Sequence, residues 1–143
     1  MPASRNAYKG YTYQQYIFTL FFAKMDTERE IRKIEAEAPK TKQFDDLYIE
    51  LEDSNTFHIQ IKNYPDSTIE DITITDHVLT IKGNSNQYNY SDNNILVVKT
   101  NRIVTNRKFM GLDSTEVNGI VIIPLVEEDV RDLIDDITSN SKF

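Results

Sequence analysis

The hydrophobic positions along the chain fall into short blocks, and their spacing predicts a helix near each end with strands between them. From Tyr11 to Lys24, apolar side chains recur at three- and four-residue steps, which is the period of a helix. The positions that share this face are Tyr13, Tyr16, Ile17, Leu20, Phe21 and Lys24, with Phe18 and Phe22 widening it. A helix that is apolar over so much of its circumference should be largely buried.

Two segments in the first half of the chain alternate apolar and polar residues, which predicts strands with one buried face. They cover Phe44–Leu51 and Thr56–Asn63 and flank turn residues at positions 53–55. We therefore expect a hairpin here. The preceding segment, Glu30–Ala38, is also expected to be a strand.

The middle of the chain is ambiguous. Ile72–Lys82 fits a hairpin that turns at Asp76 and His77, and it equally fits a strand leading into a short helix that ends at Gly83. The following segment, Gly83–Asn94, is dense in Asn and Ser and predicts a surface loop.

Two nearly continuous apolar runs, Ile95–Lys99 and Gly119–Leu125, are typical of strands buried on both faces. A final helix is expected over Leu125–Thr138, with three acidic residues in its first turn, where the helix dipole favours them. Its apolar face comprises Val126, Val130, Leu133, Ile134 and Ile137. Together the elements predict an α/β fold, a mixed sheet with helices on both faces.

The composition of the chain excludes several classes of site and partner. The chain has 143 residues, the length of one domain, and its lack of cysteine excludes disulfides, Cys-based zinc sites and thiol nucleophiles. Its net charge of −7 argues against a general nucleic-acid coat, although a local basic patch could still meet DNA. The longest apolar run, Tyr16–Ala23, is far shorter than the ~20 residues that span a bilayer, and we find no signal peptide. We expect a cytoplasmic protein with no membrane partner.

The predicted hairpin gathers polar side chains at one end. With Asn55 in the left-handed position of a three-residue loop, apolar residues pair throughout. The pairs are Leu51–Phe57, Ile49–Ile59 and Leu47–Ile61. This register places Asp46 opposite Lys62. It places Tyr48 opposite Gln60. Gln60 shares a face with Lys62 because these two residues are two positions apart on one strand. Asp46, Gln60 and Lys62 should converge, although a merely amphipathic hairpin would show the same pattern.

These residues carry a resemblance. FDDLYIEL followed by FHIQIKN resembles the PD-(D/E)XK nuclease core, in the variant where Gln replaces the second acid. The opening GYTYQQYIFTLFFA resembles the G-x-x-Y-Q helix of nuclease domains that begin many bacterial anti-phage effectors, including double-stranded-DNA endonucleases of cyclic-oligonucleotide (CBASS) defence. The match covers residues 8–63 well, and the C-terminal half in strand and helix order. It implies a restriction-endonuclease-like mixed central sheet flanked by helices, forming one nuclease domain over residues 1–143 at the front of a longer effector.

The resemblance also implies a role for each matching residue. Asp46 would bind a metal ion, Mg²⁺ or Mn²⁺, together with the side-chain oxygen of Gln60 and the main-chain carbonyl of Ile61. Lys62 would orient the attacking water and stabilise charge that builds on the phosphate. Because Gln60 removes one negative charge from the family pattern, we expect metal binding to be weaker than at a pair of acids.

Two assignments stay open in the sequence. Glu35 and Gln14 are both candidates for the acidic or amide residue that often precedes the family's Asp. Asp45 and Asp46 are adjacent carboxylates, and Asp46 is favoured because it shares a face with Lys62 in the predicted register.

The main basic cluster comprises Lys99, Arg102, Arg107 and Lys108. It fits either a solvated loop or a contact with DNA phosphates, which would position a duplex without reading its sequence. The resemblance implies metal-dependent hydrolysis of double-stranded DNA in anti-phage defence, with a sensor domain in the same longer chain and a homo-oligomer as a possible assembly. The alternative is a binding or assembly module that keeps the nuclease fold without cleaving.

Overall fold

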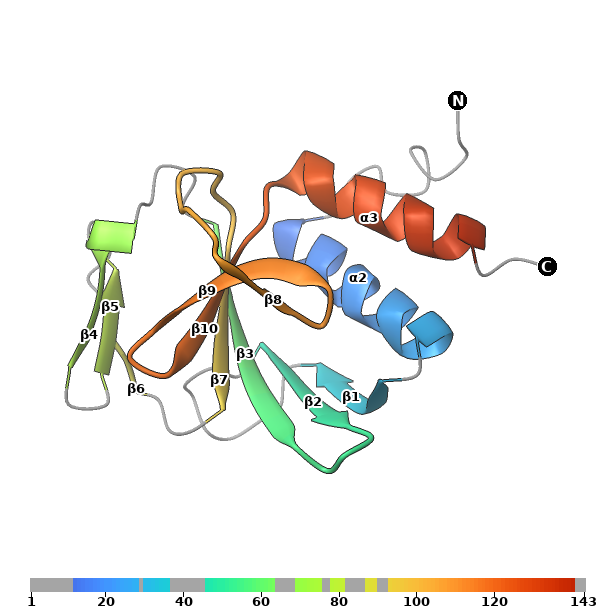
Figure 1. The fold of residues 1–143 in the computed structure, drawn as a ribbon, viewed down its shortest axis with the longest axis horizontal. Coiled ribbons are helices and arrows are strands. Elements are labelled where there is room, and N and C mark those ends of the chain that lie inside the picture. The colour runs from blue at the N-terminus through green and yellow to red at the C-terminus, as the bar shows by residue number, and fades with distance from the viewer. Residues whose placement is uncertain are drawn as a thin grey trace.

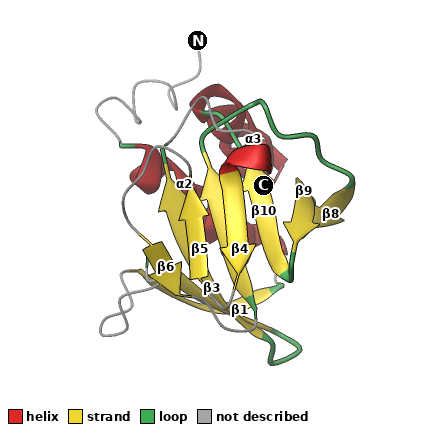
Figure 2. Ribbon diagram, turned by 90° about the vertical axis from the view of Figure 1, so that its left-hand side faces the viewer, coloured by secondary structure: helices red, strands yellow, loops and turns green. Residues whose placement is uncertain are grey.

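The computed structural model describes residues 12–28, 30–36, 46–63, 69–75, 78–81, 87–89 and 93–140. Within them the chain forms three layers: two helices, a seven-stranded sheet and a three-stranded sheet (Figure 1, Figure 2). The helices are α2 (Tyr13–Glu28) and α3 (Glu127–Asn140). The small sheet comprises β4 (Ile72–Thr75), β5 (Val78–Ile81) and β6 (Gln87–Asn89), and it follows a 3₁₀ turn, η1 (Ile69–Asp71).

The central sheet is mixed. Its strands are β1 (Ile31–Ala36), β2 (Leu47–Leu51), β3 (Thr56–Lys62), β7 (Asn94–Val98), β8 (Arg107–Phe109), β9 (Leu112–Val117) and β10 (Ile120–Pro124). They lie in the order β1-β2-β3-β7-β10-β9-β8. β3, β7 and β10 are parallel, and the other neighbours are antiparallel. This confirms the predicted α/β class with a mixed sheet, and the architecture is compatible with a restriction-endonuclease-like fold.

The helices pack together on one face of this sheet and enclose the main core there. All six positions predicted for the buried face of α2 are buried. Phe22, expected to widen that face, is instead 42% exposed. Successive residues are about 100° apart around a helix, so Phe22 falls outside the stripe that Phe21 occupies.

The opposite face of the sheet is covered differently. All five residues of β7 are buried, as predicted for a strand enclosed on both faces. Ile95 and Val97 join the core under the helices, whereas Leu96 and Val98 pack with Ile72 of β4. Both described helices lie on the first face, which corrects the expectation of helices on both faces. The second face is covered instead by strand β4, from the segment that follows β3.

In the middle of the chain, β4 and β5 pair antiparallel, which confirms the hairpin alternative for Ile72–Lys82; residues 76–77 lie outside the described ones. The segment Gly83–Asn94, predicted to be a loop, contains the short strand β6. The strand bonds of β6 to β5 explain the difference, because pairing with a neighbour compensates for a poor intrinsic strand propensity.

The hairpin of β8 and β9 was not predicted. Its turn uses Met110 and Gly111, with φ angles of 52° and 80°, and the turn from β9 into β10 uses Asn118 and Gly119, with φ angles of 47° and 91°. Two consecutive left-handed residues are the conformation of a tight hairpin turn, for which Asn-Gly is a strong sequence signal. That dipeptide could have identified the pairing of β9 with β10.

Candidate functional site

The β2–β3 hairpin has a register that differs from the predicted one by two residues. Leu47 pairs with Ile59 and not with Ile61. The left-handed loop residue is Ser54, with a φ of 77°, and not Asn55. A shift of two residues keeps every side chain on its predicted face, because side chains alternate with a period of two. The predicted polar face of the hairpin is therefore preserved, while its cross-strand partners change.

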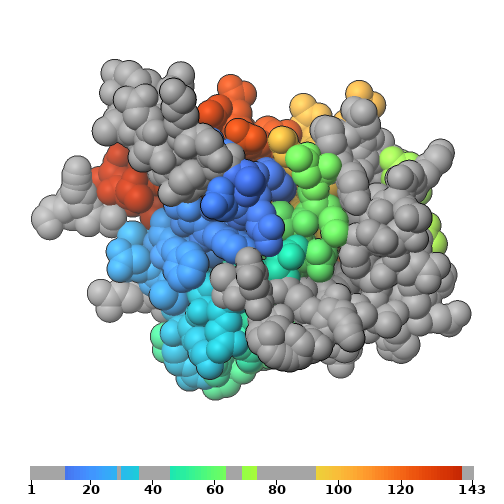
Figure 3. Space-filling view, turned by 180° about the vertical axis from the view of Figure 1, so that it is seen from behind, coloured from blue at the N-terminus to red at the C-terminus, as the bar shows by residue number. Residues whose placement is uncertain are grey.

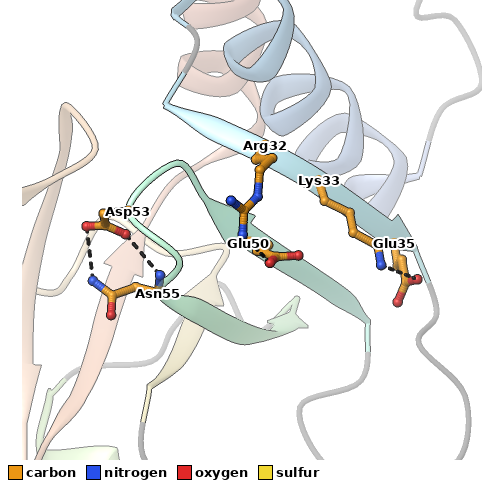
Figure 4. Close-up of polar contacts among 6 residues, drawn as sticks. All are labelled: Arg32, Lys33, Glu35, Glu50, Asp53 and Asn55. Atoms are coloured by element: carbon orange, nitrogen blue, oxygen red, sulfur yellow. Dashed lines mark hydrogen bonds and ion pairs between the residues drawn. The ribbon is translucent and has the colours of Figure 1, made fainter.

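Asp53 explains the shift. Its two carboxylate oxygens accept hydrogen bonds from the main-chain N and from Nδ2 of Asn55, both at 3.0 Å (Figure 4). Asn55 in turn accepts a bond from the main-chain N of Leu51 at 2.8 Å. Asn55 is thus held as a strand residue opposite Leu51, and the turn falls on the residues before it.

The new register brings Asp46 to Gln60. Oδ2 of Asp46 accepts hydrogen bonds from Nε2 of Gln60 at 2.7 Å and from the main-chain N of Ile61 at 2.8 Å. Gln60 is buried at 8% exposure, and Asp46 is half-buried immediately before β2. The structure therefore brings two of the three predicted residues into direct contact. Asp45, the alternative carboxylate, lies outside the described residues.

The backbone of Ile61 adds an oxygen to this place. In an antiparallel ladder a residue presents its N–H and its C=O to the same neighbour. The N–H of Ile61 points to Asp46, so its carbonyl faces the same side, beyond the point where β2 begins at Leu47. The carboxylate of Asp46, the side-chain amide of Gln60 and the carbonyl of Ile61 thus belong to one corner of the sheet, where the amide turns its nitrogen to the carboxylate.

Lys62 lies at the edge of this corner. It is half-buried, ends β3, and shares a face with Gln60. Its main-chain oxygen accepts a hydrogen bond from the main-chain N of Lys99 at 2.9 Å, which ties the end of β3 to the end of β7. Ligands of open α/β sheets commonly bind outside the carboxyl ends of parallel strands, and this corner lies at such an edge.

Three elements meet at the same edge through Lys99. Its Nζ lies 3.5 Å from the carboxylate of Glu127 at the start of α3, and 5.6 Å from the centre of the Tyr13 ring at the start of α2. The Tyr13 hydroxyl donates to the main-chain oxygen of Leu125 at 2.6 Å. Burial, with a smaller effect of the Glu127 carboxylate, raises the pKa of Tyr13. These contacts, which the sequence did not predict, join both helices to β7 beside the corner.

The two open candidates lie in different places. Gln14 is half-buried in the first turn of α2, next to Tyr13, which places it at the same edge as the corner. Glu35 lies on β1, where it is exposed, pairs with Tyr48 of β2 and forms an ion pair with Lys33 at 3.4 Å (Figure 4). Of the two, only Gln14 comes from an element whose end borders the corner.

The four basic residues do not form one cluster. Lys99 and Arg102 follow β7 at the edge beside the corner, whereas Arg107 and Lys108 lie on β8 at the far margin of the sheet. Arg107 forms an ion pair with Glu116, and Lys108 forms one with Asp113 at 2.7 Å. The four residues are close in the sequence, which is why they were expected to form one cluster. The strand β8, which was not predicted, carries Arg107 and Lys108 away from Lys99 and Arg102.

The corner's oxygens suit a hard divalent cation. Mg²⁺ prefers oxygen ligands and keeps several waters, so the Asp46 carboxylate and the Ile61 carbonyl suit it. The Gln60 amide would join them by turning its oxygen to the place of the nitrogen that now bonds Asp46. Among the described residues no group of three or more His, Cys, Asp or Glu could hold a metal. The donor set is therefore poor in charge, as expected from the Gln at position 60.

In comparisons with known proteins, no family model, curated protein or solved structure matches the chain. In the part of the chain that the structure describes, neither helix is long and apolar enough to cross a membrane.

Proposed function

We propose that the chain is a metal-dependent endonuclease domain that hydrolyses phosphodiester bonds of double-stranded DNA. The observation that carries the proposal is the contact of Asp46 with Gln60 and Ile61 at a sheet edge, with Lys62 on the same face. The order of the elements supports the PD-(D/E)XK resemblance of the sequence. Helix α2 is followed by three antiparallel strands, β1 to β3, and β7 lies parallel to β3.

In this proposal each residue of the corner has one task. Asp46, the Gln60 amide oxygen and the Ile61 carbonyl hold Mg²⁺ or Mn²⁺, which when bound lowers the pKa of a coordinated water and neutralises phosphate charge. Lys62 lies two residues from Gln60, about 6.6 Å along the strand. It orients the attacking water and stabilises the negative charge of the transition state.

We assign the DNA contacts from position alone. Lys99 and Arg102 follow β7 at the edge beside the corner, so they are the basic residues best placed to meet a phosphate. With a net charge of −7 the domain approaches DNA against its own field, so its affinity should be low and strongly salt-dependent. A sensor domain in the same longer chain, by bringing several copies onto one duplex, would raise the effective concentration.

One observation favours a second candidate, a binding or assembly module that keeps the fold without cleaving. Lys99, Arg107 and Lys108, which were expected at DNA, form ion pairs within the chain. The corner holds a single carboxylate among its three proposed ligands. Such a module would bind a cation weakly or not at all and would leave DNA intact.

Nicking of supercoiled plasmid with Mg²⁺ or Mn²⁺ tests the proposal. Lys62→Ala should lower the rate by ~10²–10³, the usual effect of removing a group that stabilises transition-state charge. The matched control Arg131→Ala removes one positive charge from α3 and should leave the rate unchanged. Nicking that needs no metal, or full activity of folded Lys62→Ala, would contradict the assigned roles. Intact plasmid at every concentration of metal and protein would favour the second candidate.

A further inference from the structure

The outer side of β1 presents backbone groups that no described strand pairs with. β1 is the first strand in the sheet order, so one side faces β2 and the other faces outward. In Figure 3 β1, coloured cyan, lies at the surface next to α2. An edge of this kind is a template for a further strand.

The hydrogen bonds of β2 determine which residues of β1 face outward. Glu52 donates its N–H to Glu30 on the β1 side, whereas Leu51 donates to Asn55 on the β3 side. Even-numbered residues of β2 therefore present their backbone groups to β1. Their partners are Lys33, opposite Glu50, and Glu35, opposite Tyr48.

It follows that Lys33 and Glu35 turn their backbone groups inward to β2, and that Ile34 and Ala36 turn theirs outward. The side chains alternate as well. Ile34 is half-buried against the core under the helices, and the side chains of Lys33 and Glu35 on the other face are 52% and 50% exposed (Figure 4). Ile34 thus presents its backbone outward between a cation, Lys33, and an anion, Glu35, and this order of charges is self-complementary about Ile34.

We propose that a second copy of this chain pairs with β1 in an antiparallel manner, across a two-fold axis at Ile34. Ile34 of each copy would exchange two backbone hydrogen bonds with Ile34 of the other. Lys33 would then lie directly opposite Glu35 of the second copy, and Glu35 opposite its Lys33. The two central sheets would become one continuous sheet, an interface of the isologous type that two-fold symmetry requires.

The charges select this register over its neighbours. An axis at Glu35 would place the two copies of Glu35 opposite each other, and an axis at Lys33 would do the same with lysines. Opposite charges directly across an antiparallel pair are stabilising and like charges are destabilising. Of these three axes, only the one at Ile34 places Lys33 opposite Glu35.

The other margin of the sheet lacks this property. β8 has three residues, two of them cations, and its central Lys108 would face Lys108 of a second copy. Arg107 and Lys108 also pair with carboxylates on β9. Because both charged residues of β8 are cations, no two-fold axis on β8 places a cation opposite an anion of the same strand. The dimer is therefore assigned to β1.

Sedimentation equilibrium of the full 143-residue chain over a concentration series tests the proposal. The wild type should show a reversible monomer–dimer equilibrium. Lys33→Glu and Glu35→Lys should each weaken the dimer by about tenfold or more, since each creates two like-charge pairs. The double exchange of the two residues should restore it. The control Lys108→Glu makes the same charge change on β8 and should have no effect.

A monomer at every concentration would overturn the proposal, and so would a dimer that neither single variant weakens. Hydrogen exchange of the wild type provides a second measurement that needs no variant. The amide of Ile34 should become protected as concentration rises, because it donates only in the dimer. An Ile34 amide that exchanges at the same rate in monomer and dimer would also overturn the proposed axis.

Discussion

Two hairpins at opposite parts of the central sheet handle their polar residues in different ways. In β2–β3, Asp46 accepts bonds from an amide and a main-chain N–H at the point where the strand begins. In β8–β9, the side chains of Lys108 and Asp113 pair across the two strands, with exposed fractions of 68% and 64%. An aspartate thus belongs to a half-buried corner in one hairpin and to a solvated ion pair in the other.

The comparison shows that position along a strand matters more than residue type. The described ladder of β2 with β3 ends at Leu47 and Ile59, and beyond it the N–H of Ile61 bonds to the side chain of Asp46, so a side chain and backbone groups of the neighbouring strand meet there. In the middle of a regular ladder the backbone groups are already paired, and a charged side chain finds only another side chain or water. Strand ends are therefore where a sheet can assemble a binding site.

Removal of the Asp46 carboxylate should have the largest effect on stability. Asp46→Ala leaves the buried amide of Gln60 and the N–H of Ile61 without this acceptor, and we expect a loss of about 1–3 kcal/mol in the free energy of unfolding. The matched change Asp113→Ala in the other hairpin should cost under about 0.5 kcal/mol. Chemical denaturation measures both. Equal losses for the two variants would remove the distinction between the hairpins.

Tyr13→Phe extends the comparison to the helix that borders the corner. Loss of the hydroxyl bond to Leu125 should cost about 1 kcal/mol near neutral pH. The pKa of Tyr13 is raised in the folded state, so its contribution is complete below the pKa of an unfolded tyrosine, about 10, and falls as the pH rises above it. The wild type should therefore lose stability above about pH 10 more steeply than Tyr13→Phe does. Parallel pH profiles in thermal denaturation would contradict this.

The smallest effect is expected for the exposed pair of β8–β9. A double-mutant cycle with Lys108→Ala and Asp113→Ala should give a coupling energy of about 0.2–1 kcal/mol, and salt should reduce it further. A coupling as large as the loss in Asp46→Ala would show that this pair, despite its exposure, is as important to the sheet as the corner.

The sequence predicts those features that depend on period and face. The six buried positions of α2 follow from its three- and four-residue spacing. The meeting of Asp46 with Gln60 survived a wrong register because a two-residue shift keeps the faces unchanged. The register itself could not be predicted from apolar pairing, since Leu47 opposite Ile59 is as apolar a pair as Leu47 opposite Ile61.

The features that escaped prediction depend on tertiary contacts. β8 has two cations among its three residues, so its pattern resembles a loop, and it is a strand because β9 pairs with it. The contacts of Lys99 with Tyr13 and Glu127 join residues that are far apart in the sequence, so no local pattern of residues predicts them. For the candidate site, the polar corner was predictable and its connection to the helices was not.

The central claim, that Asp46, Gln60 and Ile61 hold a divalent cation, is tested most directly by calorimetric titration of the metal-free chain with Mg²⁺ and Mn²⁺. Asp46→Asn, which keeps an oxygen but removes the one formal charge among these ligands, should weaken binding by about tenfold or more. Gln60→Glu, which adds a second carboxylate, should strengthen it, and Asp113→Asn should leave it unchanged. Equal affinity in the wild type and Asp46→Asn would contradict the account.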